Sequence, residues 1–411
     1  MIAKVAPHAL SGTVAAVKSK SYAHRYLIAA ALSGGRVAFG DSDDARYTAR
    51  ALSALGFEAV FDGDAVSYGA FRPSQGVVSV DVGESGSSLR FLLPLASALG
   101  VNVDFVTAGR LGERPMAALT ETLSAHGVTA TAHSVRGKLT AGVYEIDATI
   151  SSQFVTGLLL ALPLLEGDSE IRLVGRAVSA PYIDITLEVL AKAGVEVKKT
   201  ERGYAVKGGQ RFCLGEAVVP GDFSGAAFPL VAGALGDGVT VEGLDLSTAQ
   251  GDKTVVDVIR AAGGVVTTKG DRITVKKGAL RAFTADVGET PDLAPILSVL
   301  AAYASGESRL EKVGRLRDKE SDRLSAIVEM LAAAGIASHE EGDALVILGG
   351  APHGGAFDSR SDHRMAMSAA ILAAFAEGES RVDDMTCVKK SYPCFWEDFA
   401  RLGGRYEVEG R

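Results

Sequence analysis

Several features that would indicate a particular class of protein are scarce or missing in this sequence. Only 3 of the 411 residues are cysteines, and none of them has the C-x-x-C spacing, so neither a disulfide framework nor a zinc site is indicated. Reduced thiols of this kind are typical of the cytosol. The first residues, MIAKVAPHAL, contain no apolar stretch of the kind that a signal peptide needs. The longest apolar run, FVTGLLLALPLL, is too short to cross a bilayer. We therefore expect a cytoplasmic protein without a membrane partner.

An excess of positive charge is also missing. The chain has 42 Lys and Arg against 50 Asp and Glu, a net charge of −8, so we expect no nucleic-acid partner, because such partners need a basic surface. A hydrophobic content of 47% with 22% charged residues is typical of a globular chain and argues against disorder. The length is sufficient for two or three domains with substantial cores.

What the sequence does contain is an internal repeat. A nearly apolar, helix-like run opened by small, polar or charged residues recurs at intervals of roughly 65–70 residues. The six copies are SYAHRYLIAAAL, SGSSLRFLLPLASAL, SSQFVTGLLLALPLL, GDFSGAAFPLVAGAL, TPDLAPILSVLAAYA and SDHRMAMSAAILAAF. Amphipathic runs alternate with them, each closed by a glycine and followed by a β-like run, as in ALSALGFEAV and LEVLAKAGVEVKK. Glycine adopts the left-handed conformation that closes a helix before a strand. Each repeat is therefore predicted to be a βαβαββ unit of an α/β (α+β) fold.

Six units predict two domains of three units each. The boundary is expected near residues 219–221, midway between the third and fourth copies. One domain then comprises residues 19–220, and the other comprises residues 1–18 together with residues 221–411.

The first helix of each unit is apolar all round, so we expect it to be buried, with its polar residues gathered at its N-terminus. Ser and Asp at these positions can simply cap the helix. Capping does not explain Gln153, Arg25, Arg90 or Arg364. Free N–H groups and the positive end of the helix dipole form an anion site. Several such helix ends facing one cleft would bind a strongly anionic small molecule.

Basic residues also gather beside Ser, Gly and Pro turns. They are Lys20, Arg25, Arg114, Lys319, Arg323, Arg364 and Lys390. For each of them separately, a surface role remains open. The segment RDKESDR at residues 317–323 could be a solvated helix face, but on a helix its like-charged pairs four residues apart would be destabilising. Arg114 in GERPM is expected just before a helix that starts with proline at its first position. The sequence lacks the motifs that define P-loop proteins, metalloproteases, α/β-hydrolases and dinucleotide-binding domains.

Taken in order, the motifs resemble those of the EPSP synthase (3-phosphoshikimate 1-carboxyvinyltransferase) family of enolpyruvyl transferases. The motifs are SKSYAHR, DSDDARYTARALSALG, SGSSLRFL, ERPM, SSQF, SAPYIDITL, PGDFSGAAF, PDLA, KESDRL, DHRMAM and KKSYP. They extend from about Lys20 to Lys390. The resemblance implies two domains of three βαβαββ units with pseudo-threefold symmetry, an inside-out α/β barrel, and an active site in the cleft between the domains.

The resemblance also implies the reaction. The enolpyruvyl group of phosphoenolpyruvate would be transferred to the 5-hydroxyl of shikimate 3-phosphate, with release of phosphate, through a tetrahedral intermediate. It implies no cofactor and no metal, and we expect a monomer. The two substrates carry roughly five to six negative charges, which the basic residues of the motifs can balance.

The same resemblance assigns roles to individual residues. Asp292 would be the base at the 5-hydroxyl, and Glu320, with a contribution from Lys20, would move the proton at C3. The residues expected to bind shikimate 3-phosphate are Ser21, Arg25, Ser151, Ser152, Gln153, Ser179, Tyr182, Asp292 and Lys319. Those expected to bind phosphoenolpyruvate are Lys20, Gly86, Arg114, Gln153, Arg323, Arg364 and Lys390.

The sequence departs from the family pattern at a few positions. Arg315 and Glu84 each stand where Asn is common, residues 17–18 replace Pro-Gly, and Cys394 replaces Asp. None of these departures removes a group that the chemistry requires, although Arg315 and Glu84 could alter affinity.

Other readings remain open from the sequence. UDP-N-acetylglucosamine 1-carboxyvinyltransferase shares the fold, but that family carries a loop cysteine, and no cysteine of this chain precedes ERPM. A ring-shaped nucleic-acid clamp could also be built from six repeats, but it would need a basic inner face formed by helices. An inactive structural homologue is the third alternative.

Overall fold

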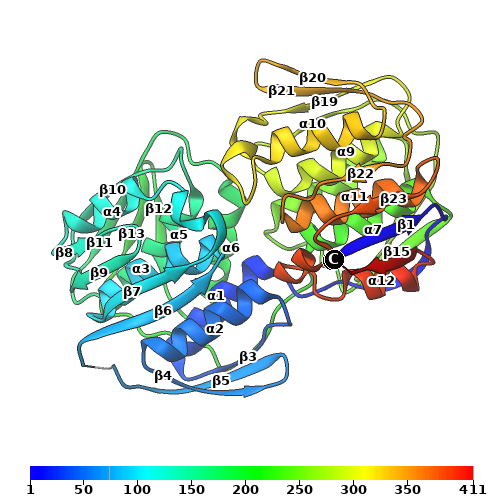
Figure 1. The fold of residues 1–411 in the computed structure, drawn as a ribbon. Coiled ribbons are helices and arrows are strands. Elements are labelled where there is room, and N and C mark those ends of the chain that lie inside the picture. The colour runs from blue at the N-terminus through cyan, green and yellow to red at the C-terminus, as the bar shows by residue number, and fades with distance from the viewer. Residues whose placement is uncertain (74, 411) are drawn as a thin grey trace. The chain divides into compact units, whose positions relative to one another are not determined.

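The computed structural model describes residues 1–73 and 75–410, which divide into two compact units (Figure 1). The first unit is Lys18–Val219, and the second unit combines Met1–Val17 with Pro220–Arg411. These bounds lie one residue from the ranges expected from the repeats. The chain therefore begins in the second unit, passes through the whole of the first and then returns.

The first unit contains three four-stranded sheets, ordered β14-β3-β5-β4, β6-β7-β9-β8 and β10-β11-β13-β12. Its helices are α1 (Lys20–Ser33), α2 (Asp43–Leu55), α3 (Gly86–Leu99), α4 (Ala117–Ser124), α5 (Ser152–Ala161) and α6 (Ala180–Lys192). Its strands are β3 (Arg36–Ala38), β4 (Phe57–Asp62), β5 (Ala65–Phe71), β6 (Val77–Gly83), β7 (Asn102–Thr107), β8 (Val128–Ala130), β9 (Ser134–Gly137), β10 (Val143–Asp147), β11 (Ser169–Val174), β12 (Val197–Thr200), β13 (Gly203–Val206) and β14 (Glu216–Val218).

The second unit also contains three four-stranded sheets, ordered β16-β17-β15-β2, β18-β19-β21-β20 and β22-β23-β1-β24. Its helices are α7 (Phe223–Leu235), α8 (Val255–Ala261), α9 (Ala294–Ala302), α10 (Arg323–Ala333), α11 (His363–Phe375) and α12 (Phe395–Arg401). Its strands are β1 (Ile2–Ala6), β2 (Ser11–Ala15), β15 (Gly238–Glu242), β16 (Val265–Lys269), β17 (Arg272–Lys276), β18 (Thr284–Asp286), β19 (Glu307–Glu311), β20 (Ser338–Glu341), β21 (Ala344–Leu348), β22 (Ala356–Phe357), β23 (Ser380–Val382) and β24 (Arg405–Glu409).

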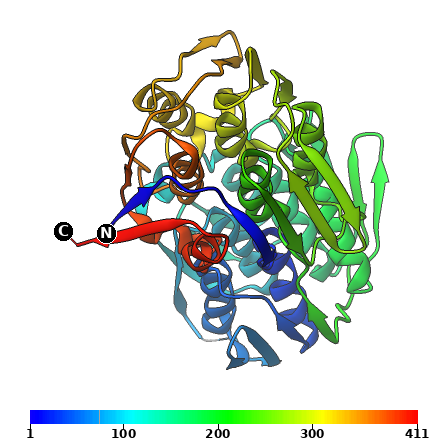
Figure 2. The same cartoon turned by 90° about the vertical axis from the view of Figure 1, so that its right-hand side faces the viewer.

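All of these sheets share one topology. In each, an edge strand pairs in parallel with its neighbour, and the next two pairings are antiparallel, as in β6-β7-β9-β8. Chain order around such a sheet is β6, α3, β7, α4, β8, β9, which is the predicted βαβαββ unit. In two of the sheets, strands from opposite ends of a unit's sequence pair with each other. In the first unit β14 pairs with β3, and in the second unit β1 pairs with β24. Accordingly, β1 and β24 lie side by side near the two chain ends (Figure 2). The predicted fold class is confirmed.

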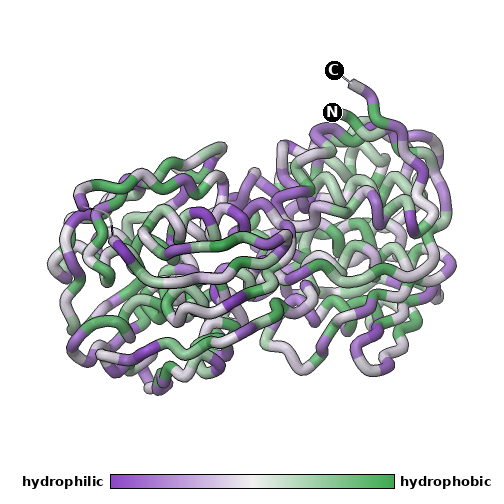
Figure 3. The backbone as a smooth tube through the Cα atoms, turned by 90° about the horizontal axis from the view of Figure 1, so that it is seen from below, coloured by the Kyte–Doolittle hydropathy of each residue, from purple (hydrophilic) through white to green (hydrophobic). Residues whose placement is uncertain are grey.

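The core of each unit is built from the apolar helices. In the second unit α7, α9 and α11 pack against one another, and nearly every residue of these helices is buried. A helix that is apolar all round can be accommodated only in this way. Each fully buried Leu or Phe there contributes about 1.5–3 kcal/mol. Along the tube of each unit apolar and polar stretches alternate, as expected for repeats with one buried face (Figure 3). Among the described residues no helix is both long and apolar enough to span a membrane.

The glycines that follow the amphipathic helices have the predicted left-handed conformation. Their φ angles lie between 73° and 115° at Gly56, Gly127, Gly194, Gly263, Gly335 and Gly403. A side chain with a Cβ rarely adopts such angles, so these positions favour glycine.

The structure answers the question left open for RDKESDR and shows that the prediction for Pro115 was wrong. The segment RDKESDR does not lie on one helix: a 3₁₀-helical turn ends at Asp318, and α10 begins only at Arg323, with Asp322 as its cap. Lys319 and Arg323 therefore do not share a helix face. Similarly, Pro115 does not start a helix, because α4 begins at Ala117 after an irregular turn.

Candidate active site

The second unit gathers charged side chains around one buried arginine. Arg323, the first residue of α10, is fully buried, and its guanidinium contacts three carboxylates. Its Nε donates to Asp362 at 2.9 Å, Nη1 to Asp292 at 3.0 Å and Nη2 to Glu320 at 2.9 Å. Burial lowers the pKa of a guanidinium, but these carboxylates raise the pKa of Arg323 above its ordinary value. Arg323 thus stays charged and fixes the positions of Asp292 and Glu320.

Asp292 is held by a second arginine. It lies in the 3₁₀-helical turn before α9, and its Oδ2 is 2.8 Å from Nη2 of Arg364 in the first turn of α11. Burial raises the pKa of a carboxyl group, but Arg364, Lys319 and Arg323 hold the pKa of Asp292 well below its ordinary value. Asp292 is therefore ionised and a weak base until one of these cations takes another anionic partner.

Asp362 organises the start of α11. As the N-cap, it accepts the backbone N–H of Arg364 at 2.9 Å, and it also accepts from the Ser321 hydroxyl and from Arg323. Capping and charge pairing are thus combined in one side chain. The motifs KESDR and DHR, about 40 residues apart in sequence, meet through this carboxylate.

Lys319 lies beside the same cluster and is partly buried. Burial lowers the pKa of Lys319 to about 8. The positive charges of Arg323 and Arg315 also lower this pKa, whereas the negative charge of Asp292 raises it. A lysine with this pKa is only partly charged at slightly alkaline pH, and an anion bound next to it would restore its proton.

One member of the cluster was missed in the sequence. Asp252 is 3% exposed, and its Oδ2 accepts a hydrogen bond from the hydroxyl of Ser224 in the first turn of α7. Burial, with Asp292 nearby, raises the pKa of Asp252 to about 7. Its Oδ1 has no hydrogen-bond partner within the described ranges. The segment QGDKT that carries Asp252 resembles an ordinary polar turn, so no sequence signal singled it out.

Lys390 occupies the last position of a 3₁₀-helical turn, Met385–Lys390, that packs against α11. It is 8% exposed, which is unusual for lysine. The predicted site residues of the second unit thus lie at the N-termini of α9, α10 and α11 and in the turns beside them.

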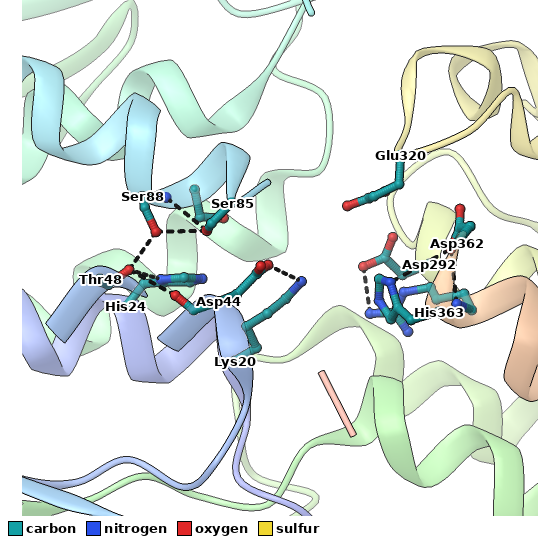
Figure 4. Close-up of polar contacts among 12 residues, drawn as sticks. Lys20, His24, Asp44, Thr48, Ser85, Ser88, Asp292, Glu320, Asp362 and His363 are labelled. Atoms are coloured by element: carbon teal, nitrogen blue, oxygen red, sulfur yellow. Dashed lines mark hydrogen bonds and ion pairs between the residues drawn. The ribbon is translucent and has the colours of Figure 1, made fainter. Parts of the chain in front are cut away.

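In the first unit, Lys20 and Asp44 form an ion pair. Lys20 is the first residue of α1, and its Nζ lies 2.9 Å from Oδ2 of Asp44 in the first turn of α2 (Figure 4). The two side chains are only 16% and 7% exposed. Asp44 was not singled out in the sequence, because a carboxylate in the first turn of a helix is common.

Arg25 is a buried cation whose hydrogen-bond acceptors among residues 1–73 and 75–410 are neutral oxygens. It is 2% exposed, and its guanidinium donates to Thr186 Oγ1 at 2.7 Å and to the backbone oxygens of Ser21 at 2.6 Å and Tyr182 at 2.8 Å. The guanidinium also lies 5.0 Å from the ring centroid of Phe91. Burial lowers the pKa of Arg25 to about 9. A buried charge surrounded by neutral oxygens favours binding of an anion.

A third group surrounds the start of α3. A Cβ added to Gly86 would lie 2.7 Å from Nη1 of Arg114, so the glycine and the arginine are in close contact. Gln153, in the first turn of α5, accepts from Arg90 at 2.6 Å and donates to Ser87 at 2.9 Å. This hydrogen bonding joins the N-termini of α3 and α5, as an anion site built from helix ends requires.

The hydroxyl residues predicted to bind shikimate 3-phosphate lie at helix starts as well. Ser151 caps α5 through the N–H of Gln153 at 3.3 Å, and Ser152 is buried next to it. Ser179 precedes α6 with φ of 53°, a left-handed conformation that a non-glycine residue adopts at a cost of about 1–3 kcal/mol. Such strain is typical of functional sites.

Comparison with known proteins agrees with the motifs. A family model described as EPSP synthase (3-phosphoshikimate 1-carboxyvinyltransferase) matches residues 5–399. The 3-phosphoshikimate 1-carboxyvinyltransferase of Clostridium kluyveri is 39% identical over 415 residues, which cover 98% of this chain and 97% of the relative. That of Methanocorpusculum labreanum is 35% identical over 413 residues, covering 97% and 98%. A solved structure of EPSP synthase from Acinetobacter baumannii shares the fold, with a TM-score of 0.84 over 100% of both chains at 24% identity. The chain belongs to the EPSP synthase (3-phosphoshikimate 1-carboxyvinyltransferase) family.

Proposed function

We propose that this protein transfers the enolpyruvyl group of phosphoenolpyruvate to the 5-hydroxyl of shikimate 3-phosphate. The products are 5-enolpyruvylshikimate 3-phosphate and inorganic phosphate. The observation that carries the proposal is the family match over residues 5–399, which includes every motif residue discussed above. The buried cations and the paired carboxylates at the helix ends support it, because both substrates are polyanions and the reaction moves two protons.

The reaction proceeds by addition and then elimination. The 5-hydroxyl loses its proton as its oxygen attacks C2 of phosphoenolpyruvate, and C3 gains a proton to become a methyl group. The tetrahedral intermediate then loses a proton from C3, and the bond between C2 and the phosphate oxygen breaks. Each step therefore needs a base and an acid, and the same groups can exchange these roles.

Asp292 is our candidate for the base at the 5-hydroxyl. Its contacts with Arg323 and Arg364 keep it ionised, as a base must be. When the carboxylate of phosphoenolpyruvate binds Arg364, that cation stabilises the charge of Asp292 less, so the pKa of Asp292 rises. Substrate binding would thereby strengthen the base. We assign proton transfer at C3 to Glu320, with a contribution from Lys20.

The remaining residues bind the two anions. Arg323 and Arg364 are assigned to the carboxylate of phosphoenolpyruvate. Because three carboxylates already surround Arg323, we expect Arg364 to make most of this contact and Arg323 mainly to orient Asp292 and Glu320. The residues assigned to the phosphate of phosphoenolpyruvate are Lys20, Gly86, Arg114, Gln153 and Lys390. Those assigned to shikimate 3-phosphate are Ser21, Arg25, Ser151, Ser152, Gln153, Ser179, Tyr182 and Lys319.

Phosphate release tests the proposed function. The purified protein is incubated with shikimate 3-phosphate and phosphoenolpyruvate, and each substrate is omitted in turn. Release that requires both substrates, together with the enolpyruvyl product identified by mass spectrometry, supports the proposal. Release only when UDP-N-acetylglucosamine replaces shikimate 3-phosphate would assign the chain to the other enolpyruvyl transferase reaction instead.

Replacing Arg364 with Ala is expected to raise the KM for phosphoenolpyruvate by about 30-fold or more while changing the KM for shikimate 3-phosphate little, since one charge of a buried pair is removed. Steady-state kinetics with each substrate varied measures the two constants. Arg360→Ala is the matched control, because Arg360 lies just before α11 in the sequence but pairs with the exposed Glu329. Equal rises of both constants would contradict the assignment of Arg364.

Binding of shikimate 3-phosphate is expected to weaken at alkaline pH. Lys319 must be protonated to pair with the anion, and its pKa of about 8 in the free protein means that its charge is lost as the pH rises past that value. The ligand phosphate is already a dianion in this range, so the dissociation constant should increase about tenfold from pH 7 to pH 9.

Calorimetric titration across this pH range measures the effect. Lys319→Arg is the control, because a guanidinium stays protonated and should remove most of the pH dependence. The same slope in both proteins would show that another group is responsible.

A further inference from the structure

A chain of buried hydrogen bonds runs through the first unit beside the Lys20–Asp44 pair (Figure 4). Nδ1 of His24 is 2.7 Å from Oγ1 of Thr48, which is 2.6 Å from Oγ of Ser88, and this hydroxyl is 2.7 Å from Oγ of Ser85. All four side chains are fully buried. They come from α1, α2 and the N-terminus of α3. None of these residues has a role in the mechanism above.

The direction of the protons in this chain follows from the bonds. The hydroxyl of Ser88 donates to Ser85, which also accepts the backbone N–H of Ser88 at 3.3 Å. Since each hydroxyl has one proton, Ser88 must accept from Thr48, and Thr48 in turn accepts from His24. The backbone oxygen of Asp44, at 3.3 Å, is a weaker alternative acceptor for Thr48.

The hydrogen-bond direction therefore places a proton on Nδ1 of His24, and burial of the ring keeps it neutral because it lowers the pKa. Burial lowers the pKa of His24 to about 3, and the positive charges of Lys20 and Arg25 act in the same direction against the opposing effect of Asp44. Nε2 is buried and has no hydrogen-bond partner within the described ranges. A lone pair at Nε2 is tolerated there more readily than an N–H without an acceptor would be.

The far end of the chain is the cap of α3. Ser85 is the N-cap, and its oxygen satisfies the N–H of Ser88. The N–H groups of Gly86 and Ser87, which no earlier turn of the helix can bond, are thereby left for a ligand at the positive end of the helix. If Ser85 lost its fixed orientation, it could turn toward these N–H groups and compete with the ligand.

We propose that His24 is a positioning residue that, through Thr48 and Ser88, locks Ser85 as the cap of α3 and so holds the backbone at Gly86 open for the phosphate of phosphoenolpyruvate. This inference rests on the proposed function, which places that phosphate at the start of α3. His24 itself touches neither substrate. The arrangement also gives a role to a fully buried histidine of which only Nδ1 is hydrogen-bonded within the described part of the chain.

Two substitutions of His24 distinguish the effect of losing the Nδ1–H donor from the effect of losing the imidazole ring. His24→Leu removes the donor and should raise the KM for phosphoenolpyruvate about 3- to 10-fold, the effect of one buried hydrogen bond, with the KM for shikimate 3-phosphate and kcat changed less than twofold. His24→Asn should restore the wild-type constant to within about twofold, because the amide nitrogen of Asn occupies nearly the position of Nδ1 and can donate to Thr48.

Ser97→Ala is the matched control. Ser97 lies on α3, the helix that Ser85 caps, and is as fully buried as His24. Its hydroxyl donates to the Leu93 oxygen at 2.8 Å, away from the cap. Its loss should lower the melting temperature without changing either KM. An unchanged KM for phosphoenolpyruvate in His24→Leu, or equal rises for both substrates, would overturn the inference. Wild-type protein inactive with both substrates would instead refute the proposed function.

A measurement on the wild-type protein covers the case in which His24→Leu does not fold. Long-range ¹H–¹⁵N spectra distinguish the two neutral tautomers of histidine, and the resonances of His24 are those missing from His24→Asn. We expect the Nδ1–H tautomer, unchanged between pH 5 and pH 8 and unchanged by ligands. A proton on Nε2 would reverse the direction of the chain and overturn the inference.

Discussion

Asp292→Asn is expected to reduce kcat by about 10²–10⁴-fold, the usual contribution of a general base, while the protein still binds shikimate 3-phosphate. The amide keeps the size of the side chain and one acceptor oxygen for Arg323, but it cannot take up the proton of the 5-hydroxyl. Single-turnover measurements with quenched samples would report the chemical step, and calorimetry would report binding.

The matched control is Asp286→Asn. Asp286 is an exposed carboxylate of the second unit that pairs with Lys312, and its neutralisation should leave kcat unchanged. If Asp292→Asn retained kcat to within about fivefold, far less than a general base contributes, the base would have to be sought elsewhere. Asp252, which is buried near Asp292 and has a pKa of about 7, would be the next residue to replace.

The second large effect concerns stability. Arg323→Met is expected to destabilise the second unit by about 3–5 kcal/mol, because it leaves three carboxylates close together without their shared cation. Trp396 is the only tryptophan of the chain and is buried in the second unit, so its fluorescence during urea unfolding reports on this unit. The midpoint of that transition should shift to lower urea concentration.

Arg317→Met is the control for this experiment. Arg317 also contacts carboxylates, those of Asp322 and Glu340, but its side chain is 41% exposed. Water screens such a pair, so its loss should cost less than about 1 kcal/mol. If the two substitutions destabilised the second unit equally, burial of the Arg323 cluster would not contribute to its stability.

The repeat and its helices could be predicted because their signals are local. Apolar runs, closing glycines and polar helix starts recur within each 65–70-residue unit, and neighbours in sequence determine them. The strands β1 and β14 could not be assigned to their sheets in this way. Each pairs with strands from a distant part of the chain, β24 for one and β3 for the other.

The start of α10 could not be predicted for a related reason. Residues 317–323 are rich in charges that an isolated helix would tolerate at some spacings, but in the structure a 3₁₀-helical turn ends at Asp318 and α10 begins at Arg323. Asp362, the fully buried partner of Arg323, lies 39 positions away in sequence. No local pattern shows such partners in advance.

The sequence by itself determined the family, the βαβαββ repeat and the residue types that chemistry on two anions requires, because these depend on local patterns and on ordered motifs. Only the tertiary structure decided which charges pair with one another. It placed Arg323 among three carboxylates, lowered the pKa of Lys319, bonded the buried Arg25 to neutral oxygens and joined His24 to the cap of α3. Electrostatic effects of this kind depend on burial and on distances of a few ångströms between remote segments, and both arise only when the chain is folded.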